Sequence, residues 1–295
     1  MDDEILEKYK KAGKISVEAK ALGIKSVKAG ITTTQLADMI EKKIFELGGK
    51  PAFPVSIGIN EMAAHYAPLK EENIQIREED YVKIDLGVHI DGYIVDTAVT
   101  VRIAGKDDLV LCSEKMNKVA LPMFRPGTKI SEISEAIENV AKEFKFNPIR
   151  NLTGHSIDRF MVHAGEVVPN TKSAVKKVIE EGEVYACEPF CTTGWGMVKE
   201  GGLLTIFRAL KNVPSRMPEG RKIMELAFGE FESLPFAKRW LQDKISPLKL
   251  DMVLRQLLGT NALHEYPVLK EVSGKPVAQT EETILTQDKP LVLTQ

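Results

Sequence analysis

The sequence predicts an α+β fold built from two related halves, and a repeat along the chain is the main reason. The residues Gly30, Leu36, Ile40, Leu47 and Pro51 recur 97 positions later as Gly127, Ile133, Ile137, Phe144 and Pro148. Residues 79–85 likewise resemble residues 182–188, now 103 positions later. An ordered series of matches indicates internal repetition far more strongly than a single match. We therefore predict two halves related by a pseudo-twofold axis, each supplying part of one site between them.

A segment that fits neither half predicts an additional subdomain. Residues 203–265 contain apolar helical stretches at 223–231 and 248–258, separated by turns that contain Pro and Gly. Residues 275–295 again have the composition of β-strands. We predict a main domain formed by residues 1–202 and 266–295, and a mostly helical insertion subdomain formed by residues 203–265.

Two helices are predicted at the start of the chain. Apolar residues recur at helical spacing between about residues 3 and 27, and Lys28-Ala29-Gly30 ends this pattern. Thr32 and Gln35 have the spacing of a capping box, which marks the start of a second helix. Gly48-Gly49 is typical of the end of that helix.

A hairpin follows, and it carries two aspartates. Residues 81–90 and 93–103 are rich in β-forming residues and are joined by Asp91-Gly92, a strong signal for a two-residue turn. This register places Asp85 opposite Ala98 and Asp96 opposite Gly87, all on one face, with Gly87 and Ala98 leaving room. Two carboxylates beside an apolar core repel one another, and a cation removes that cost. Solvated aspartates on an exposed face are the alternative.

Three further side chains complete a candidate metal site. His155 follows a glycine, Glu188 lies among apolar residues on a predicted strand, and Glu281 lies on another. Taken singly, each has an ordinary structural explanation. Four carboxylates and one imidazole together suit two divalent ions of Mn, Fe, Co or Zn, rather than a thiolate site. His65 and His163, at corresponding places in the two halves, suit hydrogen bonding to a peptide carbonyl.

The composition excludes several classes of protein. A net charge of −2 argues against a protein that binds nucleic acid mainly through phosphates. Three cysteines make no disulfide framework. The first residues do not resemble a signal peptide, and no apolar run is long enough to span a membrane. We expect a cytoplasmic monomer.

These motifs, in this order and spacing, resemble those of the methionine aminopeptidases in the creatinase and prolidase superfamily, which has the pita-bread fold. The resemblance covers nearly the whole chain. The separation of 93 positions between Glu188 and Glu281 resembles that of the longer, type 2 class, whose archaeal members are similar to this chain. The motifs that carry the resemblance are Ala64-His65-Tyr66, Asp85 with Asp96, Gly154-His155, His163-Ala164-Gly165, Glu188-Pro189-Phe190 and Ala278-Gln279-Thr280-Glu281.

The resemblance implies a metal-dependent aminopeptidase that removes the N-terminal methionine from newly made proteins and peptides, by attack of a dimetal-bound hydroxide on the first peptide bond. It assigns His65, His163 and Glu188 to catalysis, and Phe53, Val162 and Tyr266, with the two histidines, to substrate binding. It leaves a transient ribosome contact open. The metal ligands implied are Asp85, Asp96, His155, Glu188 and Glu281.

Two alternatives share these motifs. One is a prolidase-like Xaa-Pro peptidase, which typically carries an extra N-terminal domain. The other is a non-catalytic binding relative, which typically loses metal ligands. The chain also departs from the family at one motif: Thr280 and Glu282 stand where Phe and His are usual. Because alternate residues of a strand point to opposite faces, we expect this change to alter packing or charge behind Glu281, without removing that ligand.

Overall fold

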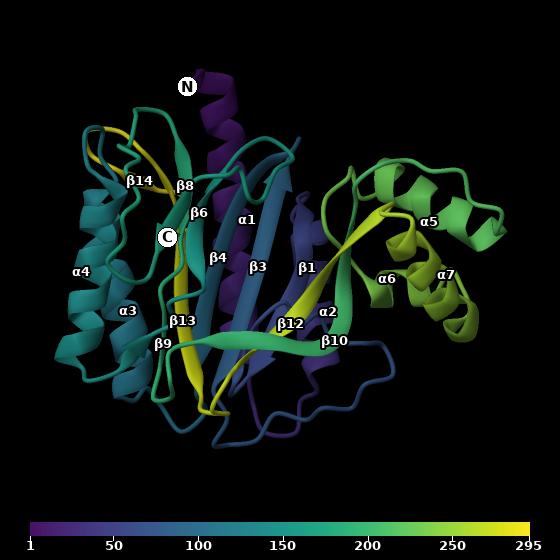
Figure 1. Ribbon diagram of the computed structural model, residues 1–295, viewed down its shortest axis with the longest axis horizontal. Helices are drawn as coiled ribbons and strands as arrows, with labels where there is room; N and C mark the ends of the chain where they lie inside the picture. Colours follow the sequence, from purple (N-terminus) through teal and green to yellow (C-terminus); the bar gives the residue numbers. More distant parts are fainter.

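The computed structural model describes residues 1–295 and shows two similar helix-and-sheet halves (Figure 1). The first half packs two helices against one face of an antiparallel sheet. The capping box predicted at Thr32 and Gln35 is present at the start of the second helix, and Gly48, with φ at 80°, follows that helix. The elements of this half are α1 (Asp3–Ser26), α2 (Thr33–Glu46), β1 (Lys50–Ile59), β2 (Met62–Ala64), β3 (Val82–Ile90) and β4 (Tyr93–Val101).

The second half repeats this plan with shorter strands. Its first helix, α3, has no counterpart among the helices expected from the sequence, whereas α4 covers the repeated apolar positions Ile133 and Ile137. The elements are α3 (Asp108–Ala120), the 3₁₀ turn Leu121–Met123, α4 (Ile130–Glu143), β5 (Asn147–Pro148), β6 (Thr153–Ile157), β7 (Val167–Pro169), β8 (Val184–Cys187) and β9 (Phe190–Thr192).

One continuous sheet joins the halves. Its strands lie in the order β1-β3-β4-β13-β8-β6-β7, and β13 (Val277–Leu285) also pairs with β9 and with β14 (Leu291–Val292). The last long strand of the chain therefore lies between β4 of the first half and β8 of the second. This position brings residues from both halves to the same place on the sheet.

The predicted hairpin register is confirmed. Asp85 pairs with Ala98, and Asp96 pairs with Gly87. Asp91 and Gly92 both have positive φ, at 52° and 84°, as a two-residue turn between twisted strands requires.

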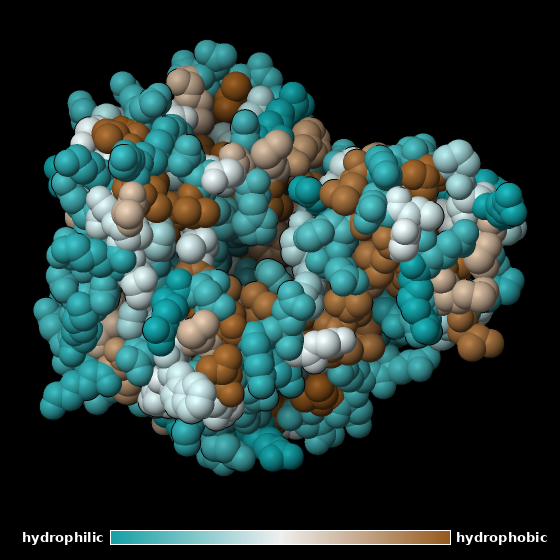
Figure 2. Space-filling view, viewed as in Figure 1, coloured by the Kyte–Doolittle hydropathy of each residue, from teal (hydrophilic) through white to brown (hydrophobic).

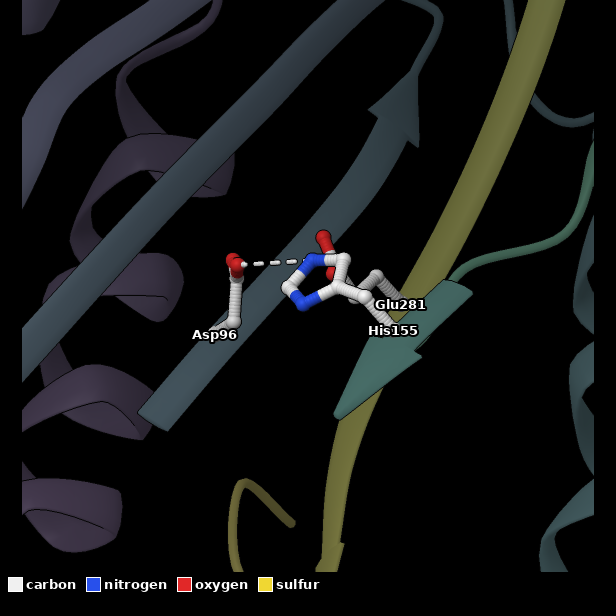
Figure 3. A group of neighbouring side chains, drawn as sticks. All are labelled: Asp96, His155 and Glu281. Carbon is white, nitrogen blue, oxygen red and sulfur yellow. Dashed lines mark ion pairs between the residues drawn. The ribbon is translucent and has the colours of Figure 1, made fainter. Parts of the chain in front are cut away.

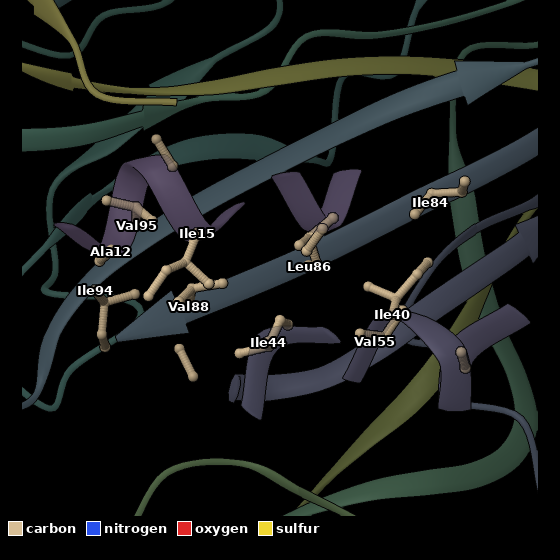
Figure 4. Close-up of a cluster of buried hydrophobic side chains, with 14 of the residues drawn as sticks. Ala12, Ile15, Ile40, Ile44, Val55, Ile84, Leu86, Val88, Ile94 and Val95 are labelled. Atoms are coloured by element: carbon tan, nitrogen blue, oxygen red, sulfur yellow. The ribbon is translucent and has the colours of Figure 1, made fainter. Parts of the chain in front are cut away.

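Each half has its own hydrophobic core. The larger cluster lies between α1, α2 and the strands β1, β3 and β4, and includes Ile15, Ile40 and Leu86 (Figure 4). A second cluster lies between α3, α4 and the strands of the other half, and it contains all three cysteines, which are buried and free. Burial of this apolar surface stabilises the packing of the helices against the sheet.

The segment after β9 forms a lobe of its own. Strands β10 (Val198–Ala209) and β12 (Leu263–Glu271) pair along most of their length and cross in front of the large sheet (Figure 1). Between them lie α5 (Pro218–Gly229), β11 (Phe236–Ala237), α6 (Lys238–Gln242) and α7 (Pro247–Gly259), which share a separate hydrophobic cluster. The two helices expected there are α5 and α7, while the division at residues 203 and 265 stays a prediction. No helix combines the length and hydropathy that crossing a membrane requires.

Candidate metal centre and cleft

All ten residues singled out in the sequence line one cavity of about 230 Å³. The cavity opens where the surface is hollowed between the main body and the lobe of α5–α7 (Figure 2). The fold thus brings together residues that are up to 228 positions apart in the chain. These residues are Phe53, His65, Asp85, Asp96, His155, Val162, His163, Glu188, Tyr266 and Glu281.

Two of the acidic residues face each other across one small residue. Ala98 of β4 pairs with Asp85 of β3 on one side and with Glu281 of β13 on the other. Directly paired residues point to the same face of a sheet. Asp85 and Glu281 therefore flank the Ala98 methyl group, which leaves space between their carboxylates.

Asp96, His155 and Glu281 form the tightest part of the site, with one potential ligand atom from each lying within 4.8 Å of the others (Figure 3). His155 Nε2 lies 3.4 Å from Glu188 Oε1 and 3.8 Å from Asp96 Oδ2. His155 Nδ1 lies 3.3 Å from the Ser156 carbonyl oxygen, which can only accept a hydrogen bond. With the proton on Nδ1, the Nε2 lone pair faces the carboxylates, as metal ligation requires. Asp85 lies outside this tight group.

The carboxylates have chemical features that fit a cation. Asp85 Oδ1, Asp96 Oδ1 and Glu281 Oε1 are buried without any hydrogen-bond partner. Burial raises the pKa of Asp85 to about 7, and it raises the pKa of Asp96, with the charge of Asp85 adding to the effect. Buried oxygens without partners are costly, and a divalent ion supplies both the missing partner and the compensating charge.

Glu188 shows the same electrostatic pattern in a different local setting. Burial, followed by the charges of Asp96 and Asp85, raises its pKa. The prediction that it lies on a strand was wrong: β8 ends at Cys187, and β9 begins at Phe190. Pro189 has no N–H to donate to a neighbouring strand, so the strand is interrupted here. Glu188, in this interruption, lines the cavity.

The glycine before His155 is required by a close backbone approach. A Cβ atom at Gly154 would lie 2.5 Å from the carbonyl oxygen of Ala186. This glycine lets β6 lie close against β8 and so brings His155 next to Glu188.

Two residues that position the acidic residues, Gln279 through their carboxylates and Thr283 through the Asp96 backbone, were not assigned a role from the sequence. Gln279 Nε2 lies 3.4 Å from both Glu188 Oε2 and Glu281 Oε2, so its amide bridges two acids. Thr283 Oγ1 accepts from the Asp96 N–H and donates to the Asp96 carbonyl, both at 2.7 Å. The spacing of Gln279 from Glu281 on one strand face was the only available signal.

The unusual Glu282 points away from Glu281 as expected, and it has a partner. The ammonium of Lys20 in α1 lies 3.0 Å from Glu282 Oε1 and 2.7 Å from Thr97 Oγ1. The hydroxyl groups of Thr97 and Thr294 donate to the same carboxylate. The negative charge that replaces the family's usual histidine is thus neutralised behind the site.

The two histidines assigned to catalysis, His65 and His163, differ in their surroundings. His65 has a left-handed backbone (φ 64°), and its Nδ1 lies 3.2 Å from the Pro267 carbonyl oxygen. Burial lowers the pKa of His65 to about 4, so this ring is neutral at pH 7. His163 lies against His155, with ring centroids 4.3 Å apart. Burial lowers the pKa of His163, and the positive charge of Arg208 lowers it further.

Comparison with known proteins identifies the family. Residues 7–206 match metallopeptidase family M24. A methionine aminopeptidase of Pyrococcus horikoshii is 42% identical over 291 residues, covering 98% of this chain and 99% of that protein. A methionine aminopeptidase of Thermococcus onnurineus is 43% identical over 286 residues, covering 96% and 97%.

Solved structures show the same fold at lower identity. An Arx1 protein from a thermophile has a TM-score of 0.87 at 21% identity, covering 99% of this chain and 91% of its own. A methionine aminopeptidase of Thermotoga maritima gives 0.72 at 22%, covering 100% and 98%. A prolidase of Pyrococcus furiosus gives 0.64 at 16%, covering 100% and 64%. The pita-bread fold expected from the motifs is confirmed, and the full-length archaeal relatives show that the chain belongs to metallopeptidase family M24 and, within it, to the methionine aminopeptidases.

Proposed function

We propose that this protein removes the N-terminal methionine from newly made proteins and peptides. The observation that carries the proposal is a group of buried carboxylates with unpaired oxygens, beside a histidine whose Nε2 faces them, in a cavity that apolar residues line in part. The names of the archaeal relatives support the choice of substrate. The spacing of Glu188 and Glu281 supports the longer, type 2 class.

Two divalent ions fit this donor set. Carboxylate oxygens and one imidazole nitrogen bind Mn, Fe, Co or Zn. When bound, the ions would polarise a water molecule and the first peptide carbonyl. Asp96 and Glu281 each bring one potential ligand atom within 4.8 Å of a ring nitrogen of His155. The ligands would be Asp85, Asp96, His155, Glu188 and Glu281.

The chain's own groups then divide the work at the first peptide bond. The sequence suggested that His65 bonds to a peptide carbonyl. With its Nδ1 proton donated to the Pro267 carbonyl, the neutral ring instead presents a lone pair on Nε2, which would accept a hydrogen bond from a substrate N–H. His163 makes no hydrogen bond of its own and is free to donate to the carbonyl oxygen as negative charge develops there. Glu188, whose pKa burial raises, is suited to hold and transfer the proton of the attacking water.

The methionine side chain would occupy the apolar end of the cavity. Phe53 from β1, Val162 and Tyr266 from β12 line it together with Ile206. Pro235 from the lobe closes the same wall, so the insertion contributes to the shape of the pocket. We propose that the protein acts as a cytoplasmic monomer on chains leaving the ribosome, with transient ribosome contact.

Hydrolysis of a Met-Ala-Ser peptide tests the proposal. Metal-stripped protein is assayed with Mn, Fe, Co and Zn added separately, and an Xaa-Pro dipeptide is assayed alongside. Metal-dependent release of free methionine is the expected result. Cleavage of the Pro dipeptide alone would identify a prolidase-like enzyme instead. Absence of cleavage with every metal, in protein shown to be folded, would favour the non-catalytic binding relative.

A further inference from the structure

We propose that Arg208 and His264 form a subsite at the mouth of the cleft that binds acidic side chains of the substrate beyond its second residue. This inference rests on the proposed function. It assigns a sequence preference downstream of the cleaved bond, and it names two residues that lie outside the cavity around the metal centre.

Strand pairing places both residues on the wall of the cleft. On β10 and β12, Ile206 pairs with Tyr266, and both line the cavity. Arg208 and His264 are the next pair on the same face, because each lies two residues further along its strand. The step is about 6.6 Å, which is the length of two residues of an extended peptide.

Solvent exposure of these side chains rises from the cavity toward Arg208 and His264. Ile206 is buried, Tyr266 and Arg208 are half-buried, and His264 is exposed. The row therefore leads from the cavity to solvent. A substrate chain whose first residue fills the cavity would have to leave along such a path.

The charge of Arg208 has no partner within the protein. Its side chain makes no ion pair or hydrogen bond, and its Nε is buried without any acceptor. Arg102 and Arg239 also have buried nitrogens without hydrogen-bond partners, but each has an acidic partner for its charge: Asp107 for Arg102, and Glu41 and Asp38 for Arg239. A half-buried guanidinium left free at a cleft is suited to bind a carboxylate from outside, by two parallel hydrogen bonds.

The residues around Arg208 connect its guanidinium group to the cleft. Arg208 lies beside His264 in the strand pairing, one step beyond the cavity residues Ile206 and Tyr266. His264 packs edge-on against Tyr266, with ring centroids 4.8 Å apart, and Tyr266 packs in the same way against His65, at 5.6 Å. A continuous row of aromatic rings thus connects the reacting end of the cleft to the arginine.

Three peptides of equal length test the subsite: Met-Ala-Asp-Asp-Ser, Met-Ala-Lys-Lys-Ser and Met-Ala-Ser-Ser-Ser. We expect kcat/KM for the acidic peptide to exceed that for the basic one by about fivefold, the factor that a single partly exposed ion pair supplies. The difference should lie mainly in KM, since the contact is remote from the reacting atoms. It should shrink when the salt concentration rises from 0.05 to 0.5 M, because added ions screen the interaction.

Variants distinguish the subsite from a general effect of charge. Arg208→Gln should bring the ratio of acidic to basic kcat/KM close to one, and Arg208→Lys should keep part of it. Lys199→Gln makes the same change of charge at an exposed position near the other end of β10, and it should keep the full ratio.

Each outcome decides between the alternatives. Equal kcat/KM for the three peptides in the unaltered protein, or a ratio that persists in Arg208→Gln, would overturn the subsite while leaving methionine removal intact. If Arg208→Gln does not fold, the salt titration of the unaltered protein decides: a ratio that does not change with salt would overturn the proposal. If no peptide is cleaved, including the serine peptide, the proposed function itself fails, and the subsite fails with it.

Discussion

Gly87 lies directly against the ring of Phe53, its partner on the neighbouring strand β1. A Cβ atom at position 87 would lie 2.3 Å from Phe53 Cε1. The space left by this glycine is therefore filled by an aromatic ring of the proposed methionine pocket and is not open to the metal site.

Gly87→Ala should therefore change substrate binding as well as stability. The added methyl group has to push the Phe53 ring into the cavity, which should raise KM for Met-Ala-Ser about tenfold. The variant should also lose about 1–3 kcal/mol of unfolding free energy. Peptide kinetics and urea unfolding measure the two effects. Gly229→Ala is the control, since a Cβ atom there meets nothing within 4 Å. An unchanged KM in Gly87→Ala would show that Phe53 does not border the methionine side chain.

The Lys20–Glu282 pair should be important for stability. Both side chains are largely buried, and removing one partner leaves a buried charge uncompensated. Lys20→Met should therefore destabilise the protein by about 3 kcal/mol. Lys10→Met, on an exposed part of the same helix, should cost about 0.5 kcal/mol or less.

A double-mutant cycle by urea unfolding isolates the pair. Lys20→Met combined with Glu282→Gln should lose less than the sum of the two single changes, by about 1 kcal/mol. Additive losses would show that the two side chains do not depend on each other, and that Glu282 is stabilised by Thr97 and Thr294 alone.

Metal binding should weaken as pH falls through about 7. Burial raises the pKa of Asp85 to about 7, so below that pH its carboxyl group binds a proton that a cation must displace. Isothermal titration calorimetry with Mn between pH 6 and 8.5 should show tighter binding, and fewer protons released, as pH rises. Asp85→Asn should bind Mn more weakly and with a smaller dependence on pH. A pH-independent affinity in the unaltered protein would contradict this role of Asp85.

His163→Ala should lower kcat without removing metal. If His163 donates to the developing oxyanion, kcat should fall by about 10²–10³. The metal content, measured by elemental analysis after dialysis, should equal that of the unaltered protein, because His163 is not among the proposed ligands. Loss of metal, with kcat restored on adding it back, would assign His163 to the metal site instead.

The sequence by itself determined the local features of this protein. The register of β3 and β4 follows from alternating apolar residues and the Asp91-Gly92 turn, both of which act between near neighbours. The capping box at Thr32 and the two insertion helices were likewise readable from short-range patterns. The motifs identified the family, and every residue to which the resemblance gave a catalytic, metal-binding or substrate-binding role lines the same cavity.

Only the tertiary structure decided which distant residues meet. Lys20 and Glu282 lie 262 positions apart, and no local pattern relates them. Gln279 can bridge two acids only because β13 lies between β4 and β8, with β9 pairing alongside. Arg208 and His264 become neighbours through pairing across a lobe more than fifty residues long. Such contacts depend on how buried strands from both halves share one sheet, and a single sequence does not specify that at the level of individual side chains.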